Sequence, residues 1–269
     1  PPLIEYLESL LTGAGNDLDL QTFKLTDQLT GRMMGVRADM TPQVARIDAH
    51  RLNREGPTRL CYLGSVLHTR PEISGATRSP IQVGAELYGH ATIESDLEVI
   101  RLMLEMVKMA GHSSLVLDLG HVGIYRGLIE QAGISAADEP QLFDAFQRKA
   151  ATELEQIVHR VVSDESFREQ LITLNSLNGG IEILAKAKSV LDCAVHPAIE
   201  QLEKIAAIAE QQQWGVELHF DLAELRGYDY HTGVLFAAYV PQKGIAVAQG
   251  GRYDNVGAVF GRARPATGF

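Results

Sequence analysis

Cysteine is scarce in this chain, which argues against a fold stapled by disulfides. Only Cys61 and Cys193 occur among the 269 residues, and neither belongs to a CxxC pair or a Cys/His cluster. Two isolated thiols are typical of a protein from a reducing compartment. We therefore expect both to be buried free thiols in a cytoplasmic protein, with no metal bound through cysteine.

Further absences narrow the functional classes. No apolar run is long enough to span a bilayer, and no signal peptide is visible. The formal net charge of -10 repels phosphate backbones, so nucleic acid is a poor default partner unless a local basic patch overrides the average. HExxH, GxSxG, EF-hand, P-loop and dinucleotide-binding patterns are missing, so the sequence predicts no metal and no cofactor.

The two ends of the chain also lack the usual signals. It opens on Pro1-Pro2 without a methionine and stops at Gly268-Phe269 without a terminating pattern. We therefore expect both ends to be trimmed, so that a segment missing at either end proves nothing.

What is present is an ordinary globular composition, 45% hydrophobic and 22% charged. A helix is expected to begin at a capping box of Ser95 and Glu98 and to stop at Gly111. Strand-like patterns occupy residues 60–67, 81–89, 115–119, 216–221, 234–240 and 245–249.

The order of these patterns predicts an α+β fold. Residues 136–213 are mostly helical in pattern and separate two strand-rich parts. We expect a core domain of residues 1–135 and 214–269, interrupted by a helical insertion at 136–213. The late strands are joined by links too short for crossover helices, so the sheet should be largely antiparallel, with flanking helices.

Residues 225–233 read LRGYDYHTG and carry the densest set of ligand-binding side chains. Arg226 offers a planar fork suited to a carboxylate or phosphate. Gly227 allows a close backbone approach, and Tyr230 and His231 supply hydrogen-bonding groups for a small polar ligand. His219, on a nearby alternating strand, is expected to be a surface or satisfied histidine rather than a metal ligand.

The strand at 81–89 has a polar face formed by Gln82, Gly84, Glu86 and Tyr88. If that face lay at the surface, Gln82 and Glu86 would simply be solvated. Gly84 favours the alternative, because a glycine between them leaves a shallow floor where a ligand can approach a sheet. Glu86 could then accept an N–H from a cationic or imidazole ligand, and Gln82 could both donate and accept.

A second polar alternation, VRADMTP at residues 36–42, contains Arg37, Asp39 and Thr41. Asp39 could hold an ammonium group. The same segment could equally start a helix, with Thr41 as N-cap and Pro42 in the first turn. The glycine-rich turn GGRYD at residues 250–254 is unspecific when taken alone.

Taken together and in this order, these segments resemble the catalytic domain of histidyl-tRNA synthetase, a class II aminoacyl-tRNA synthetase. The resemblance runs from Pro2 to Phe269. It rests on VRADMTP, on GATRSPIQVGAELYG from Gly75 to Gly89, on LRGYDYHTG, and on GGRYD with the closing PATGF. The family's fold is therefore expected here.

Two departures from the synthetase pattern bear on catalysis. Where the family carries an arginine and a glutamate for ATP, this chain has His68-Thr69-Arg70: His68 takes the arginine position, the glutamate is absent and the loop is about one residue short. An imidazole poorly replaces a guanidinium fork on phosphate. In addition, His231 stands where the family has a second tyrosine.

A kept ligand pocket beside damaged adenylation residues resembles a paralogue of the synthetase, the regulatory subunit of ATP phosphoribosyltransferase. Residues 117–126, LDLGHVGIYR, also look like that paralogue. The resemblance implies a non-catalytic cytoplasmic protein that self-associates as a dimer. It would join a short catalytic subunit in a hetero-octamer, activate it and confer feedback inhibition by histidine. A working histidyl-tRNA synthetase domain is the alternative.

For the histidine ligand, the resemblance implies a pocket of seven residues. Glu86, with Tyr230 or His231, would read the imidazole. Asp39, Thr41 and Gln82 would hold the α-amino group, and Arg226 would hold the carboxylate.

Overall fold

The computed structural model describes residues 1–12, 16–71, 76–241 and 244–269. These residues group into two compact units, the first formed by Pro1–Ser95 with Tyr253–Phe269 and the second by Asp96–Arg252. Helices and antiparallel strands occur in both, so the expected α+β class is confirmed. Within the described ranges, none of the helices is long and apolar enough to cross a membrane.

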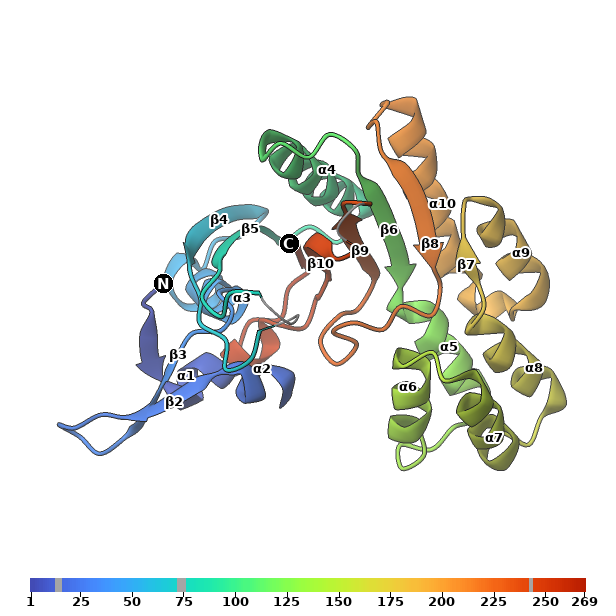
Figure 1. The fold of residues 1–269 in the computed structure, drawn as a ribbon, viewed down its shortest axis with the longest axis horizontal. Helices are drawn as coiled ribbons and strands as arrows, with labels where there is room; N and C mark the ends of the chain where they lie inside the picture. Colours follow the sequence, from blue (N-terminus) through green and yellow to red (C-terminus); the bar gives the residue numbers. More distant parts are fainter. Residues whose placement is uncertain (13–15, 72–75, 242–243) are drawn as a thin grey trace. The chain divides into compact units, whose positions relative to one another are not determined.

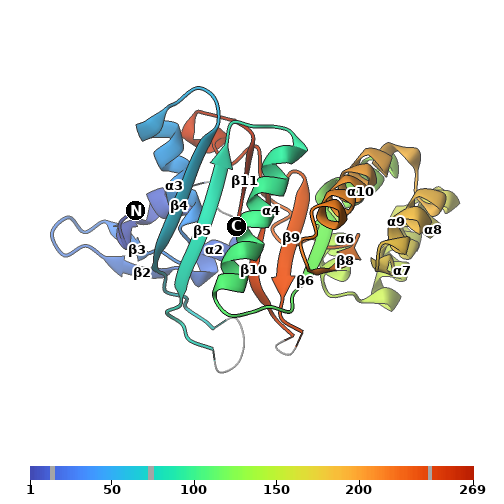
Figure 2. The same cartoon turned by 90° about the horizontal axis from the view of Figure 1, so that it is seen from above.

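The first unit is built on two groups of antiparallel strands. A small sheet has the order β1-β3-β2, and β5 pairs with both β4 and β11. Strands β4 and β5 run side by side over their whole length (Figure 2). The elements are β1 (Ile4–Tyr6), α1 (Leu7–Leu11), α2 (Asn16–Gln21), β2 (Phe23–Thr26), β3 (Met33–Val36), α3 (Thr41–Arg46), the π-helical turn η1 (Ile47–Leu52), β4 (Thr58–Ser65), β5 (Ile81–Tyr88), the 3-10 turn η3 (Ala258–Phe260) and β11 (Ala266–Gly268).

The second unit places helices against the strand order β10-β9-β6-β8-β7. Its pairs are antiparallel except β6 with β8, which are parallel, so the expectation of a largely antiparallel sheet holds. Helix α4 starts at the end of the first unit. The elements are α4 (Ile93–Met109), β6 (Val116–His121), α5 (Val122–Gln131), α6 (Glu139–Gln147), α7 (Ala151–Val161), α8 (Glu165–Leu174), β7 (Asn178–Gly179), α9 (Glu182–Val190), the 3-10 turn η2 (Cys193–Val195), α10 (His196–Gln211), β8 (Glu217–Asp221), β9 (Val234–Tyr239) and β10 (Ala246–Arg252).

Helices α6 to α10 make residues 139–211 almost entirely helical, and Figure 1 shows this block in yellow-green to orange. Each helix buries an apolar stripe, as Leu142 and Phe146 do in α6 and Leu154 and Val158 in α7. The boundaries of an insertion at 136–213 stay a prediction.

Three local expectations need correction. Helix α4 begins at Ile93, so Ser95 lies in its first turn and donates its hydroxyl to the carbonyls of His90 and Thr92 instead of forming a capping box. Cys61 and Cys193 are free thiols, but both are exposed, because one lies on the open face of β4 and the other in a surface turn.

Candidate functional site

Asp39 anchors a cluster of polar side chains in the first unit. It lies in the turn before α3, and its Oδ1 accepts three hydrogen bonds: from the backbone N–H of Thr41 at 3.1 Å, from the Thr41 hydroxyl at 3.2 Å and from the Gln82 amide at 2.7 Å. The Gln82 Oε1 in turn accepts the N–H of Met40 at 3.0 Å. The structure thus brings together the three residues expected to hold an amino group.

The start of α3 settles the other interpretation of VRADMTP. The helix runs from Thr41 to Arg46 with Pro42 in its first turn, and Met40 occupies the N-cap position without a side-chain cap. Thr41 is therefore the first helical residue rather than the cap. Its hydroxyl is directed to Asp39, so the segment both starts a helix and contributes to the polar cluster.

Glu86 lies deepest in this cluster, with only 2% of its surface exposed. Its Oε1 lies 3.0 Å from the hydroxyl oxygen of Tyr62, within hydrogen-bonding distance. Its Oε2 has no hydrogen-bond partner within the described part of the chain. Burial, together with the charge of Asp39, raises the pKa of Glu86 well above its ordinary value. The interpretation of Glu86 as a solvated surface residue is therefore wrong.

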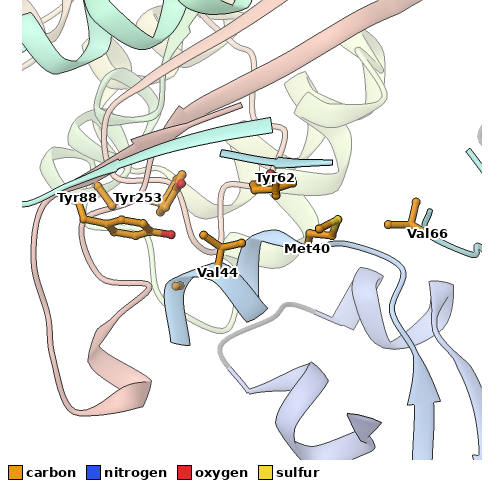
Figure 3. Close-up of a cluster of buried hydrophobic side chains, with 8 residues drawn as sticks. Met40, Val44, Tyr62, Val66, Tyr88 and Tyr253 are labelled. Carbon is orange, nitrogen blue, oxygen red and sulfur yellow. The ribbon is translucent and has the colours of Figure 1, made fainter. Parts of the chain in front are cut away.

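The polar face of β5 is covered over the second half of the strand, where the apolar face is buried as well. Ile81 and Val83, on the apolar face of the first half, are 70% and 42% exposed, whereas Ala85 and Leu87 on the same face are buried. Tyrosines cover the polar face together with apolar residues from the α3 region, and Figure 3 shows them gathered as one cluster. The labelled members are Met40, Val44, Tyr62, Val66, Tyr88 and Tyr253. Of these tyrosines, Tyr62 covers Glu86 with its ring and brings its hydroxyl within hydrogen-bonding distance of the carboxyl group.

Gly84 does not leave the open floor that the sequence suggested. Tyr62 is its cross-strand partner, and a side chain at position 84 would overlap the Tyr62 ring and the carbonyl of Phe269. The missing side chain makes room for Tyr62 rather than for a ligand. Tyr62 is thereby held where its hydroxyl reaches both Glu86 and, at 3.2 Å, Thr41.

Arg226 belongs to a second polar cluster, in the second unit. Its guanidinium pairs with Glu224 at 3.0 Å, donates to the Gln249 Oε1 at 3.1 Å and lies 3.9 Å from the Oδ2 of Asp118. Glu224 also accepts the backbone N–H of Arg226 at 2.8 Å. His219 contacts the other oxygen of Asp118 at 2.7 Å, so it is a satisfied histidine as expected. The arginine is thus already surrounded by acceptors.

His231 is buried in the turn that follows. Its exposed fraction is 7%, and its Nδ1 lies 3.1 Å from the carbonyl of Arg226. Because a carbonyl only accepts, Nδ1 carries the proton. Burial lowers the pKa of His231 to about 4, so the ring is neutral at pH 7. Gly227 makes this turn possible with a φ of 62°, and the Tyr230 ring, 44% exposed, packs against the His231 ring.

His68, at the position of the synthetase arginine, is also committed to the fold. Its Nε2 lies 3.0 Å from the carbonyl of Ala38. Arg70, two residues further on, is exposed. Gly75, the first residue of GATRSPIQVGAELYG, lies outside the described residues.

Sequence reasoning missed two residues that shape these clusters. Tyr62 could have been found, because a tyrosine within a predicted buried strand needs a partner for its hydroxyl. Glu224 had no such signal, since an acid two residues before an arginine is common on any surface. Among the described residues, no group of three or more His, Cys, Asp or Glu side chains is arranged to hold a metal ion.

Chemically, the first cluster suits an amine, whereas the second can take an anion only if that anion displaces Glu224 from Arg226. Asp39 presents an ionised carboxylate with Thr41 and Gln82 beside it, and Glu86 presents an oxygen that can accept an N–H. Arg226 presents a guanidinium. Nothing in either cluster resembles an activated nucleophile, because the two buried histidines of the chain, His121 and His231, are both hydrogen-bonded within the fold.

Comparison with known proteins identifies the family of the chain. The family model described as histidyl-tRNA synthetase matches residues 1–269. A curated ATP phosphoribosyltransferase regulatory subunit from Thioalkalivibrio sulfidiphilus is 59% identical over 272 residues, which cover 100% of this chain and 69% of the relative. A second, from Nitrosococcus oceani, is 59% identical over 270 residues and is covered to 68%. The chain thus spans about two thirds of the length of these relatives.

Solved structures give the same answer for the fold. A structure titled ATP phosphoribosyltransferase regulatory subunit/histidyl-tRNA synthetase from Bacillus halodurans superposes with a TM-score of 0.88 at 31% identity, covering 99% of this chain and 70% of that one. An ATP phosphoribosyl transferase (HisG:HisZ) complex from Thermotoga maritima matches at a TM-score of 0.74 and 20% identity, with 100% and 88% covered, and supports the fold alone. The class II synthetase-like fold is therefore confirmed.

Proposed function

Because this chain belongs to the family of ATP phosphoribosyltransferase regulatory subunits, we propose that it controls that enzyme by binding histidine and does no chemistry of its own. Its function is regulatory, in the enzyme that carries out the first step of histidine biosynthesis. The single observation that carries this conclusion is the 59% identity to curated regulatory subunits along the whole chain.

The non-catalytic part of the proposal is supported by His68. Adenylate formation needs positive charge on a phosphate, and losing such a group typically costs a few kcal/mol of transition-state stabilisation. His68 bonds to a backbone carbonyl and offers no guanidinium fork.

The histidine site is proposed on the residues of the two clusters. Asp39, Thr41 and Gln82 hold the α-amino group, since Asp39 supplies an ionised carboxylate. Glu86 accepts an N–H of the imidazole through its buried Oε2. Other side chains are rejected because they leave that buried oxygen without a partner.

For Arg226, Tyr230 and His231 the proposal rests on the resemblance of LRGYDYHTG to the corresponding segment of histidyl-tRNA synthetase. Arg226 holds the carboxylate, and Tyr230 assists in reading the ring. His231 has the weakest support, because its Nδ1 already donates to the Arg226 carbonyl.

The proposed partner is a short catalytic subunit of ATP phosphoribosyltransferase, which this chain activates and makes sensitive to histidine. A dimer of this chain and a hetero-octamer with the partner are part of the proposal. Histidine must bind the inhibited state better than the active one, and a coupling of about 1–3 kcal/mol is sufficient for useful control. A cytoplasmic location, supported by the free thiols Cys61 and Cys193, and a helical insertion at 136–213 complete it.

Mixing the chain with a purified short catalytic subunit tests the function. The proposal expects co-elution in size-exclusion chromatography, faster phosphoribosyl transfer than by the catalytic subunit alone, and inhibition of the mixture by histidine. Histidine-dependent exchange of pyrophosphate into ATP by the chain alone would instead establish the synthetase alternative. No co-elution and no effect on the transfer rate would reject the regulatory assignment.

The site is tested separately by calorimetry with histidine. Glu86→Ala, Asp39→Asn and Arg226→Ala are each expected to weaken binding at least tenfold, since each removes a hydrogen bond to a charged or buried group. Glu105→Ala, an exposed carboxylate on α4, is the matched control and should bind as the parent does. Unchanged affinity in Glu86→Ala would show that the ring is read elsewhere.

A further inference from the structure

Four side chains of the first unit form a continuous line of hydrogen-bonding contacts. The Thr41 hydroxyl lies 3.2 Å from the Asp39 Oδ1 and 3.2 Å from the Tyr62 hydroxyl, which lies 3.0 Å from the Glu86 Oε1. Both ends are carboxyl groups, and the two middle members are hydroxyls. Tyr62 and Glu86 are buried, with exposed fractions of 7% and 2%. Water therefore has little access to the inner half of the line.

The number of protons does not match the number of contacts when both carboxyls are ionised. The hydroxyls of Thr41 and Tyr62 supply one proton each, but the line has three contacts, and each contact needs one proton between its two oxygens. A further acceptor, the Phe269 carbonyl, lies 3.4 Å from the Tyr62 oxygen. With only two protons, one pair of neighbouring oxygens has no hydrogen between them, so their lone pairs repel each other. Burial makes this repulsion costly, because the local dielectric constant is low.

We propose that Glu86 carries the missing proton in the ligand-free protein, and that Tyr62 is the positioning residue that links it to Thr41 and Asp39. The Glu86 O–H then donates to Tyr62, Tyr62 donates to Thr41, and Thr41 donates to the ionised Asp39. All three contacts become hydrogen bonds. Asp39 keeps the single negative charge, where the Gln82 amide and the Thr41 backbone N–H also stabilise it.

The other titratable groups around Glu86 leave this assignment intact. Tyr88 from β5 and Tyr253 from the segment after β10 face the same interior. The backbone of Gly268 on β11 lies so close that any side chain there would overlap the Glu86 carboxyl group and the Tyr253 hydroxyl. Asp48 on η1 is paired with Arg264. Within the described part of the chain no lysine or arginine pairs with Glu86, so no cation there favours its ionised form.

The proton determines which form of the ligand fits, an inference that rests on the proposed histidine site. With Glu86 neutral, its Oε2 accepts one N–H but offers no charge to an imidazolium. A neutral imidazole ring has one N–H donor and matches this oxygen. The site therefore selects histidine with a neutral ring and a charged amino group, and the positive charge is read only at Asp39.

Carbon NMR of the ligand-free chain, labelled at glutamate Cδ, tests the proton without any histidine. The Glu86 signal should keep the shift of a protonated carboxyl at pH 7, and the signal of exposed Glu105 on α4 serves as the comparison. Tyr62→Phe keeps the ring under Gly84 and should lower the pH at which Glu86 ionises by about one unit, because it removes an acceptor of the Glu86 proton. If Tyr62 instead donates to an ionised Glu86, the same variant shifts that pH upward, which overturns the proposal.

Calorimetry at two pH values tests the choice of ligand form. The ring of free histidine has an ordinary pKa of about 6.5, so its neutral share falls about tenfold between pH 7.5 and pH 5.5. Affinity should fall about tenfold with it, equally in the parent and in Glu86→Gln, which keeps a neutral acceptor. A parent that binds as tightly at pH 5.5, while Glu86→Gln loses affinity, refutes a neutral Glu86. If neither binds histidine at either pH, the proposed function fails, and the NMR titration still decides the proton.

Discussion

Replacing Glu86 by glutamine should remove a specific dependence of stability on pH. The side chain is buried in the first unit, and burial with the nearby charge of Asp39 raises its pKa well above the ordinary value of 4.5. Between these two pKa values the folded protein holds a proton that the unfolded chain releases. Stability contributed by Glu86 is therefore complete below pH 4.5 and is lost as pH rises toward the folded pKa.

The magnitude follows from the linkage relation. One proton held only by the folded state costs about 1.4 kcal/mol of unfolding free energy for each pH unit in that window. Glu86→Gln has no proton to lose, so the difference between variant and parent should move in favour of the variant by up to about 1.4 kcal/mol for each pH unit between 4.5 and the raised folded pKa of Glu86. Other titrating groups are common to both proteins and cancel in the difference.

Urea unfolding followed by far-ultraviolet circular dichroism at pH 5, 6, 7 and 8 measures this difference. Glu105→Gln, an exposed glutamate, is the control and should run parallel to the parent. Parallel curves for Glu86→Gln and parent across the series would show that Glu86 titrates at an ordinary pKa, and would refute the reasoning from its burial.

Three other changes have expected outcomes. Asp48→Asn breaks the buried ion pair with Arg264, whose charged atoms lie 3.2 Å apart and whose side chains are 3% and 9% exposed. It should lower the free energy of unfolding in urea by about 3–5 kcal/mol. Lys24→Ala, in the exposed pair with Asp19, should lower it by at most about 1 kcal/mol. Burial lowers the pKa values of His121 and His231 to about 4, so both bind fewer protons in the folded protein than in the unfolded chain. The protein should therefore lose about 3 kcal/mol of stability per histidine between pH 7 and pH 4. In His121→Gln and His231→Gln the corresponding part of this loss should be absent. Gly84→Ala must displace the Tyr62 ring and should cost about 1–3 kcal/mol or more, with weaker histidine binding; equal melting temperatures would contradict the packing described here.

The strands could be predicted from alternation, but the buried face of β5 could not. The usual rule holds for Ala85 and Leu87 on the apolar face, which are buried, but Ile81 and Val83 on that face are exposed, and Glu86 on the polar face is buried. Glu86 can be buried because Tyr62 from β4 covers it and its hydroxyl lies within hydrogen-bonding distance of the carboxyl group. That contact depends on residues far apart in the sequence and leaves no periodic signal.

Single positions in the site show the same limit. Asp39 and Thr41 were expected to serve one ligand group, and the structure adds a direct contact between them that spacing alone did not predict. Gly84 was interpreted as space for a ligand, although Tyr62 fills it from the neighbouring strand. His231 was expected in a ligand pocket, and only its carbonyl partner reveals that the ring also closes a turn.

The neighbours of Arg226 have a consequence for any anion that approaches it. Glu224 already occupies the guanidinium at 3.0 Å, so an incoming carboxylate gains only the difference between two similar ion pairs. Acetate or formate alone should therefore bind only weakly at Arg226. Glu224 therefore shields Arg226 from simple anions of the solvent, because any anion that binds the guanidinium must first displace that carboxylate.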